Sequence, residues 1–460
     1  MDEATTRRTA LITVTLMSLA TPFMVSGVNV ALPRIGQEFG VSALLLSWLA
    51  TAYSLAGAVF LLPAGKLADI HGRKRVFLVG TAVYAVASVL CASMRAVGPL
   101  IAARVVQGVG AAMLFATSTA ILTSVFPAAD RGRVLGYNVA AVYLGMSAGP
   151  FVGGLMVEAW GWRSVFWVNV PLSLLTLLFG LWKMKGEWAG SPDDRFDLAG
   201  SAIYGVAVVA LMLGFSQLPA LRGAGLIAAG LACGAAFFRW ERRAAFPVLA
   251  LGLLRGNRVF VLSSLAALTN YAATSSVTFL LSLYLQYAKG LTPRQAGTIL
   301  IAQPIVQTIL SPLAGRLSDR VGARNVASGG MAFTVTGLIL LTFLRESTPI
   351  AYVVGCLLVL GFGFALFSSP NTSAIMGAVE RRYYGMASSI VATMRLFGQM
   401  LSMGIAMILF ALYMGQAQIT PEYYGRFIAS ARTAFAISAV LCALGIVASL
   451  ARNSGHPPAD

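Results

Sequence analysis

Long apolar runs separated by short polar stretches dominate this chain of 460 residues. Most runs are about 20 residues long, which is the length that a helix needs to cross the hydrocarbon core of a membrane. The pattern predicts fourteen membrane-spanning helices, at residues 10–32, 45–64, 76–94, 98–122, 134–157, 164–183, 198–218, 223–240, 259–284, 294–314, 325–344, 349–375, 386–412 and 430–451. The fold class is therefore an all-α polytopic membrane protein.

Composition agrees with this class, because 58% of the residues are hydrophobic and only 11% are charged. A soluble domain carries roughly 25% charged residues. A net charge of +17 would suggest nucleic acid as the partner of a soluble protein. In a membrane protein the same charge reflects basic cytoplasmic loops. With a cytoplasmic N-terminus, 22 Lys and Arg lie in cytoplasmic loops and 9 in outer loops. We expect both termini in the cytoplasm, and no nucleic-acid partner.

Residues that bind metals or cofactors do not cluster in the sequence. The four cysteines lie singly within apolar runs, and the two histidines lie in a loop and a tail. No phosphate-binding loop is present, so ATP does not power this chain directly. A membrane enzyme would need clustered His, Asp or Glu, and a sensor would normally carry an appended soluble domain. We therefore expect a protein that is not an enzyme and holds no cofactor.

A charged stretch between the second and third predicted spans recurs in the second half of the chain. It reads Gly-Lys-Leu-Ala-Asp-Ile-His-Gly-Arg-Lys-Arg from Gly65 to Arg75, and its near copy starts at Gly315, 250 residues later. A repeat at this offset indicates two duplicated halves. The economical interpretation is a six-helix bundle at 1–184, an inserted helix pair with its linkers at 185–258, and a second six-helix bundle at 259–460.

The repeated stretch needs Gly72 for the positive φ of a tight turn, and places Asp69 near a helix end. A solvated basic loop would be the simpler interpretation, but loop charges need not repeat Gly-x-Leu-x-Asp-x-x-Gly. The pattern closely resembles the signature cytoplasmic loop of the major facilitator superfamily. The resemblance implies two bundles that rock about a latch, with Arg131 or Arg133 as partners of the aspartate. The implied latch residues are Gly65, Asp69, Gly72, Arg73, Gly315 and Asp319.

The fifth predicted span carries glycines at a spacing of four, which lets helices approach closely. This stretch resembles the motif of drug antiporters in the same superfamily, and the wider chain resembles fourteen-span exporters of the EmrB/QacA type. The motif residues are Gly145, Gly149, Pro150, Gly153 and Gly154. Ordinary close packing is the simpler role for them.

Ionisable residues within the spans are few. Arg104 lies six residues into its span, in a segment that resembles a motif associated with proton transfer, although its side chain could also reach the outer surface. Arg395 lies about ten residues into its span, near the middle of the bilayer, with Gln399 one turn further on.

None of the sixteen acidic residues falls at mid-span. The exporters of this type usually carry an aspartate five residues before Asn29, where this chain has Met24. Glu158, at the outer end of the fifth span, is the nearest remaining carboxylate. The predicted proton relay or cavity comprises Arg104, Glu158, Arg395, Asn29 and Gln399.

These features predict a secondary transporter in the cell inner membrane that exports amphipathic, drug-like compounds by alternating access. The family resemblance implies proton antiport, multidrug efflux and antibiotic resistance. The alternative is an exporter or flippase of a lipid-linked or anionic molecule that is not coupled to protons, because Met24 replaces the usual aspartate. The expected partners are a small-molecule or lipid-like substrate and membrane lipids, and the resemblance also allows a periplasmic adaptor.

Overall fold

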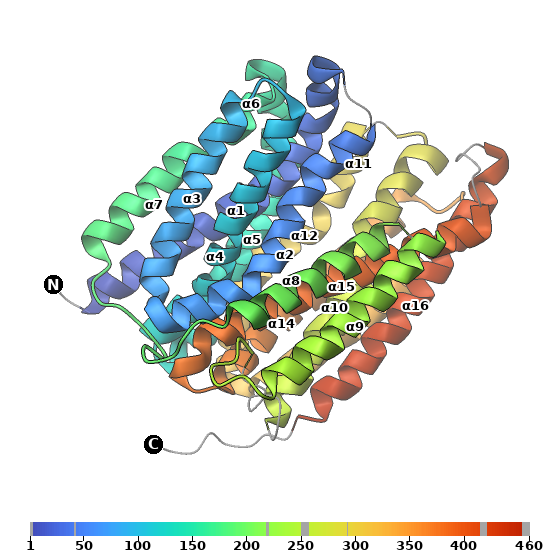
Figure 1. Ribbon diagram of the computed structural model, residues 1–460. Coiled ribbons are helices and arrows are strands. Elements are labelled where there is room, and N and C mark those ends of the chain that lie inside the picture. Colours follow the sequence, from blue (N-terminus) through green and yellow to red (C-terminus); the bar gives the residue numbers. More distant parts are fainter. Residues whose placement is uncertain are drawn as a thin grey trace. The chain divides into compact units, whose positions relative to one another are not determined.

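A computed structural model describes residues 3–40, 43–217, 220–249, 257–291, 293–414 and 421–452 (Figure 1). The described regular structure consists of helices. The α-helices are α1 (Glu3–Phe39), α2 (Ala43–His71), α3 (Arg73–Ser93), α4 (Val97–Val125), α5 (Arg131–Trp160), α6 (Arg163–Trp167), α7 (Asn169–Lys183), α8 (Leu198–Ser216), α9 (Leu221–Glu241), α10 (Arg258–Leu283), α11 (Pro293–Leu300), α12 (Ala302–Val321), α13 (Ala323–Leu341), α14 (Ile350–Gly377), α15 (Tyr384–Met414) and α16 (Tyr424–Leu450). Short helical turns η1 (Ala128–Asp130), η3 (Tyr284–Ala288), η4 (Arg381–Tyr383) and η5 (Pro421–Tyr423) join some of them.

Twelve helical segments in the described part of the chain are long and apolar enough to cross a membrane, compared with the fourteen predicted spans. Two long helices at predicted spans, α10 and α13, do not belong to the twelve. Helix α10 is rich in serine and threonine, and α13 has Arg324 and Asn325 in its first turn. These polar residues lower their hydropathy. The chain is thus an all-helical, multi-pass membrane protein, and the count of fourteen stays a prediction.

Three predicted elements differ in detail from the observed helices. The span predicted at 164–183 is interrupted at Val168, and the span at 294–314 is interrupted at Ile301. The second span continues to His71, so the stretch from Gly65 is the last part of α2 and not a hairpin loop. The chain turns only at Gly72, whose φ is 103°, and the copy turns likewise at Gly322, whose φ is 93°.

Contacts divide the chain into two compact units. Unit 1 comprises Met1–Val209, Cys233–Leu251 and Val379–Thr393, and unit 2 comprises Ala210–Ala232, Gly252–Ala378 and Met394–Asp460. In unit 1, α1 packs along α5, and α4 packs against α2 and α3 (Figure 1). In unit 2, α14 packs against α12 and α13, and α16 packs against α10 and α13. Helices α8, α9 and α15 each contribute residues to both units.

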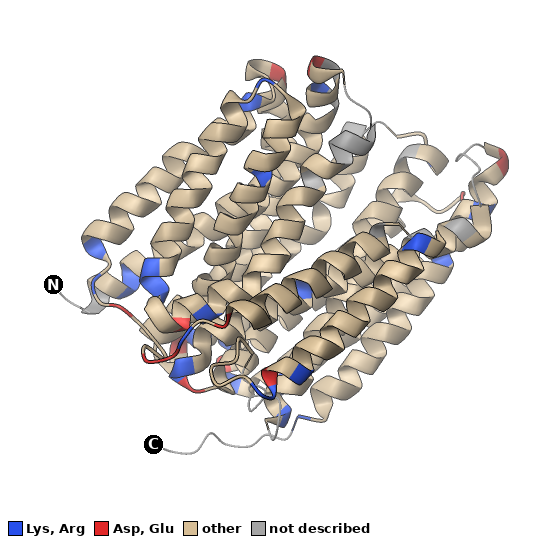
Figure 2. Cartoon of the chain, in the orientation of Figure 1, with Lys and Arg blue, Asp and Glu red and all other residues tan. Residues whose placement is uncertain are grey.

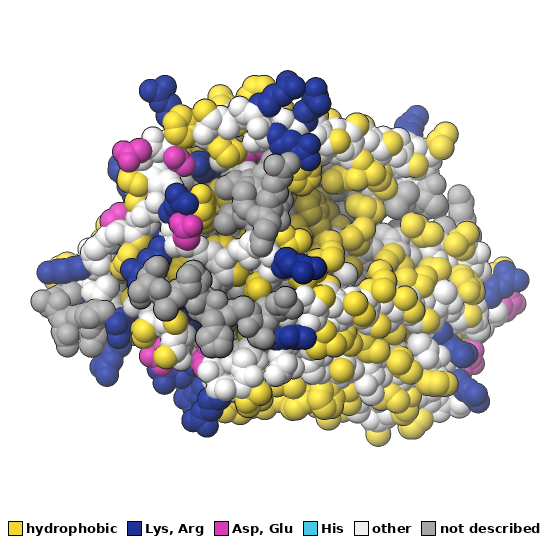
Figure 3. Space-filling model, turned by 90° about the horizontal axis from the view of Figure 1, so that it is seen from below, with side chains coloured by type: hydrophobic (Ala, Val, Ile, Leu, Met, Phe, Trp, Pro, Cys, Tyr) yellow, Lys and Arg dark blue, Asp and Glu magenta, His cyan; other side chains and the backbone are white. Residues whose placement is uncertain are grey.

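Charged residues concentrate near the helix ends and in the connecting segments, whereas few lie in the middle of a helix (Figure 2). The face in Figure 3 shows many Lys and Arg side chains with only scattered Asp and Glu among hydrophobic groups. Large apolar side chains also stand exposed along the helices; on α7 they include Leu174, Leu178, Leu181 and Trp182. An apolar exterior of this kind fits lipid as the solvent.

Candidate functional site

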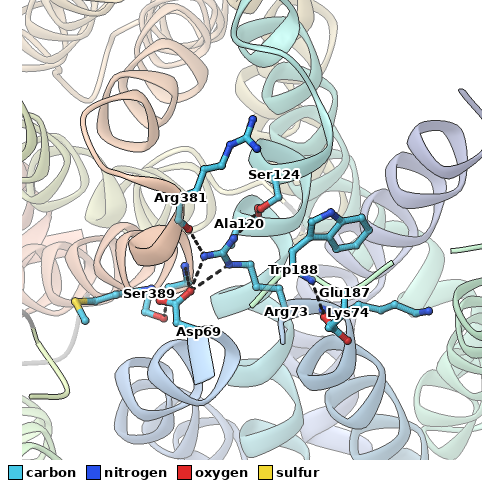
Figure 4. A network of polar contacts seen from close by, with 11 residues as sticks. Asp69, Arg73, Lys74, Ala120, Ser124, Glu187, Trp188, Arg381 and Ser389 are labelled. Carbon is cyan, nitrogen blue, oxygen red and sulfur yellow. Dashed lines mark hydrogen bonds and ion pairs between the residues drawn. The ribbon is translucent and has the colours of Figure 1, made fainter. Parts of the chain in front are cut away.

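Asp69 is the centre of a buried polar network in unit 1 (Figure 4). Its Oδ1 accepts a hydrogen bond of 2.9 Å from the backbone N–H of Gly385, and its Oδ2 accepts one of 2.9 Å from Met386. These N–H groups lie in the first turn of α15, where they have no partner within the helix. A carboxylate is favoured there because the helix N-terminus carries partial positive charge.

Arg73 completes the network from the first turn of α3. Its Nη2 lies 2.7 Å from Asp69 Oδ1 and also donates to the carbonyl oxygen of Arg381, and its Nη1 donates to Ser124 Oγ at 2.9 Å. The side chains of Asp69 and Arg73 are both 2% exposed. A buried ion pair must be well hydrogen-bonded to offset its desolvation. The contacts to α15 and to Ser124 meet this requirement.

Glycines allow α2 and α15 to approach each other closely at this network. An added Cβ at Gly65 would overlap Ser389 and lie 2.7 Å from the carbonyl oxygen of Gly385. An added Cβ at Gly385 would lie 2.7 Å from both Asp69 Oδ1 and the carbonyl oxygen of Gly65. Gly385 was not among the predicted latch residues, although it lies 253 positions after Gly132, the same offset that separates Gly108 from Gly361.

The basic residues predicted as partners of the aspartate make other contacts. Arg131 donates to the Tyr384 hydroxyl at 3.0 Å, and its Cζ lies 5.6 Å from the centre of that ring. Arg133 pairs with Asp130 at 3.0 Å. Asp69 forms its ion pair with Arg73, four residues away on the neighbouring helix α3. Only Gly72 separates the end of α2 from the start of α3, and the turn at this glycine brings the side chains of Asp69 and Arg73 together.

The second copy of the motif differs in burial. Gly315 is buried, but Asp319 is exposed near the end of α12. The repeated sequence therefore produces a buried network around Asp69 and an exposed carboxylate at Asp319.

The glycines of α5 form its contact with α1. An added Cβ at Gly145 would overlap the carbonyl oxygen of Leu19, one at Gly149 would overlap Ser26, and one at Gly153 would lie 3.0 Å from Gly27 Cα. Gly154 has more space, since its nearest neighbour, Val30, would be 3.7 Å away. Pro150 lies within the helix and is exposed.

Arg104 is fully enclosed, at 1% exposure. Its Nη1 donates to Gln107 Oε1 at 2.6 Å, its Nε donates to the carbonyl oxygen of Leu49 at 3.2 Å, and its Cζ lies 4.4 Å from the centre of the Tyr53 ring. Gln107 in turn donates to Ser88 at 2.8 Å. This geometry braces α4 against α2 and α3.

Two other residues of the predicted relay, Glu158 and Asn29, belong to unit 1. Glu158 is exposed in the last turn of α5, whereas Asn29 is exposed within α1, ten residues before that helix ends at Phe39. Met24 is fully buried, and the side-chain amide of Asn169 lies 3.9 Å from its sulfur. The position where the family resemblance would place an aspartate thus holds an apolar side chain beside a buried amide.

Arg395 and Gln399 lie in the part of α15 that belongs to unit 2, and both are half-buried. The Cζ of Arg395 lies 5.9 Å from the centre of the Tyr271 ring, and that ring packs edge-on against Phe364 at 5.4 Å. A partly exposed cation beside aromatic rings can bind anionic or electron-rich aromatic compounds.

Unit 2 contains a buried network around Arg452 that was not predicted from the sequence. Arg452 is 2% exposed and donates to Ser263 Oγ at 2.8 Å and to Asn371 Oδ1 at 3.0 Å. Burial and the neighbouring Arg324 lower the pKa of Arg452 to about 10. It joins the end of α16 to α10 and α14, a role that its position after the last predicted span does not reveal.

Curated relatives cover most of the chain. The riboflavin transporter RibZ of Clostridioides difficile (strain 630) is 28% identical over 421 residues, covering 91% of each chain. The multidrug resistance protein Stp of Mycobacterium tuberculosis (strain ATCC 25618 / H37Rv) is 34% identical over 384 residues, 82% of this chain and 71% of Stp. The methylenomycin A resistance protein of Streptomyces coelicolor is 31% identical over 407 residues, 85% of this chain and 84% of that protein.

Solved structures show the same fold at low sequence identity. The human organic anion transporter MFSD10 has a TM-score of 0.67 at 14% identity, covering 98% of this chain and 100% of that one. The proton:xylose symporter XylE has a TM-score of 0.68 at 13% identity, covering 97% and 95%. The sequence pattern of the Major Facilitator Superfamily matches residues 14–262 and 263–459. The chain is a transporter, not an enzyme, and it belongs to the major facilitator superfamily.

Proposed function

We propose that this protein is a secondary active exporter of amphipathic, drug-like compounds, working by alternating access as a proton antiporter. The observation that carries the proposal is the buried network in which Asp69 accepts hydrogen bonds from Gly385 and Met386. The two hydrogen bonds can break and form together, because Asp69 lies near the end of α2 and its two donors lie at the start of α15. The resistance proteins among the relatives support export, and the drug-antiporter pattern in α5 supports the same direction.

In this proposal Asp69, Arg73 and the glycines around them form the latch, which closes the cytoplasmic side. Gly315 and Asp319 are the equivalent residues of the second half. The roles of Glu158, Asn29 and Gln399 in a proton relay or cavity are part of the same proposal. We assign Arg104 to the support of α4, because a side chain that is 1% exposed reaches a substrate only after Tyr53 moves.

We further propose fourteen spans of the EmrB/QacA type, with α10 and α13 crossing the membrane despite their polar residues. The halves are 1–184 and 259–460, with 185–258 as the inserted pair. Both termini lie in the cytoplasm and the membrane is the cell inner membrane, with a periplasmic adaptor as a further partner. The excess of basic residues in the assigned cytoplasmic loops, 22 against 9, supports this orientation. Labelling of single cysteines placed in successive loops tests it.

A second function is favoured by the position of the charges: export of a lipid-linked or anionic molecule without proton coupling. Met24 is apolar and buried, and Glu158 is exposed near a helix end. Arg395 is half-buried beside Tyr271. The spans thus offer a cation more readily than a carboxylate. The relative RibZ is named as a transporter of riboflavin, which is an aromatic compound and differs in kind from a cationic drug.

Substrate-induced pH change in inverted vesicles separates the two functions. Proton antiport predicts that adding a transported compound releases protons from acid-loaded vesicles. Uncoupled transport predicts uptake that does not change when the pH gradient is collapsed. Absence of proton movement with every transported compound would rule out the antiporter, whereas absence of transport by folded protein would rule out both.

A further inference from the structure

The linker between α7 and α8 is docked on the turn between α2 and α3. We call residues 184–197 the strap. The backbone N–H groups of Gly190 and Ser191 both donate to the carbonyl oxygen of Asp69, each at 2.8 Å. The carbonyl oxygen of Trp188 accepts from the N–H of Arg73 at 3.2 Å. The strap therefore holds the main chain of the two residues whose side chains form the latch.

Glu187 fixes the strap to the start of α3. Its Oε1 accepts from the N–H of Lys74 at 2.8 Å (Figure 4). Its Oε2 accepts from the N–H of Arg75 at 3.1 Å. The residue before this helix, Gly72, has no side chain to supply a cap. Glu187 supplies the missing acceptor, and a carboxylate at a helix N-terminus is also favoured by the helix dipole.

An ion pair fixes the strap to α2. Lys66 Nζ lies 2.6 Å from Asp194 Oδ2, and the two side chains are 5% and 31% exposed. The adjacent Asp193 is exposed, and within the described part of the chain it forms no ion pair. These two neighbouring aspartates therefore form a matched pair for experiment.

The strap also meets the segment before α15. An added Cβ at Gly190 would overlap the backbone of Arg382, so a glycine is needed for this approach. Arg73 donates to the carbonyl oxygen of Arg381 in the same segment. The α2–α3 turn, the strap and the start of α15 thus meet around Asp69.

We propose that the strap is a third component of the latch and links it to the inserted helices. Asp69 is held by its carboxylate to α15 and by its carbonyl oxygen to the strap. Every strap contact with the α2–α3 turn stays intact when α15 leaves, so the strap moves with the turn and keeps Asp69 and Arg73 positioned to rebind. Glu187 and Asp194 are positioning residues, and weakening either one favours the open latch. This inference rests on the proposed latch function.

The rate at which a buried cysteine is alkylated measures latch opening. The reporter is Ser389→Cys, because Ser389 is fully buried beside Gly65. It is placed in the full-length protein after the four native cysteines are replaced by alanine. We expect Glu187→Ala and Asp194→Asn each to raise the rate about fivefold, which corresponds to ~1 kcal/mol. Glu187→Gln keeps an acceptor and restores part of the difference, and Asp193→Asn changes nothing.

Asp69→Asn is the reference for a broken latch. If it raises the alkylation rate while Glu187→Ala and Asp194→Asn leave it unchanged, the strap is not part of the latch but the latch itself stands. If Asp69→Asn also leaves the rate unchanged, both proposals fail. An equal increase with Asp193→Asn would show a general effect of linker charge and would overturn the role of Asp194. Thermal unfolding of each variant identifies a variant that has merely lost its fold.

Discussion

The carboxylate of Asp69 accepts a hydrogen bond of 2.9 Å from the backbone N–H of Gly385, which lies 316 positions later in the chain. The same carboxylate pairs with Arg73 at 2.7 Å. A charged group at the end of one helix thus caps the start of another. The arrangement depends on glycine at both Gly65 and Gly385, where a side chain would overlap the opposing helix.

Replacing Asp69 by asparagine removes the charge that α15 and Arg73 share. Hydrogen bonds to charged groups are worth about 1.5–3 kcal/mol, so we expect transport to fall at least about tenfold. Cargo binding, measured by fluorescence or calorimetry on purified protein, should stay within about twofold. Asp319→Asn is the matched control at the exposed copy and should have a smaller effect. Loss of binding in folded Asp69→Asn protein would contradict the latch role.

The contact between α1 and α5 predicts a graded response to alanine along one helix face. Gly145→Ala forces a methyl group against the carbonyl oxygen of Leu19, whereas Gly154→Ala has 3.7 Å to its nearest neighbour. Overpacking of this kind costs about 1–3 kcal/mol. We expect a lower unfolding temperature for Gly145→Ala than for Gly154→Ala in the same detergent. Equal temperatures for the two variants would contradict close packing as the role of this motif.

Arg395 predicts a preference among cargo charges. Arg395→Gln should weaken binding of an anionic aromatic compound by about fivefold to tenfold and leave a neutral analogue unchanged. Arg426→Gln is the matched control, because Arg426 also lies over a tyrosine, with its Cζ 5.4 Å from the Tyr423 ring centre, but is exposed. Competition binding on purified protein measures both. A parallel loss for anionic and neutral compounds would indicate a packing effect instead of charge recognition.

Met24 predicts where a proton site can be introduced. Met24→Asp places a carboxyl group beside the side-chain amide of Asn169, which lies 3.9 Å from the present sulfur. We expect transport in vesicles to become dependent on the pH gradient, or more strongly dependent than in the wild type. Met24→Asn has a similar shape without the titratable group and should show the wild-type dependence. Identical pH dependence in the aspartate and asparagine variants would contradict the prediction.

Glu38 predicts a small loss of stability in acid. Hydrogen bonds from Arg163 and from the indole N–H of Trp162 hold the pKa of Glu38 below its ordinary value of 4.5. A lowered folded-state pKa means that the pair stabilises the fold fully above pH 4.5 and that this contribution is lost as the pH falls through the lowered pKa. The pair is partly exposed, so the contribution is about 0.2–1 kcal/mol. Glu38→Gln should lower the unfolding temperature at pH 7, and the difference from the wild type should shrink as the pH falls below 4.5 and through the lowered pKa.

Hydrophobic periodicity and the internal repeat determined the fold class from sequence alone. Runs of about 20 apolar residues have few stable alternatives to membrane helices, because every backbone polar group must be satisfied within the segment. The repeated Gly-x-Leu-x-Asp motif also located the turn at Gly72 and Asp69, the centre of the proposed latch. These are local properties, set by residues within one or two helical turns.

Tertiary structure alone decided which residues meet. The partners of Asp69 on α15 are backbone N–H groups. Nearly every residue type carries such a group, so the sequence cannot identify these partners. Tertiary packing buries Asp69 but leaves its copy Asp319 exposed. It also encloses Arg104 and Arg452 in polar networks, although the local sequence of neither arginine indicates such a network. The docking of the strap, too, rests on main-chain carbonyls and on glycines that permit close approach. The sequence determines which functional group each position carries, whereas packing between distant segments determines which other group it contacts.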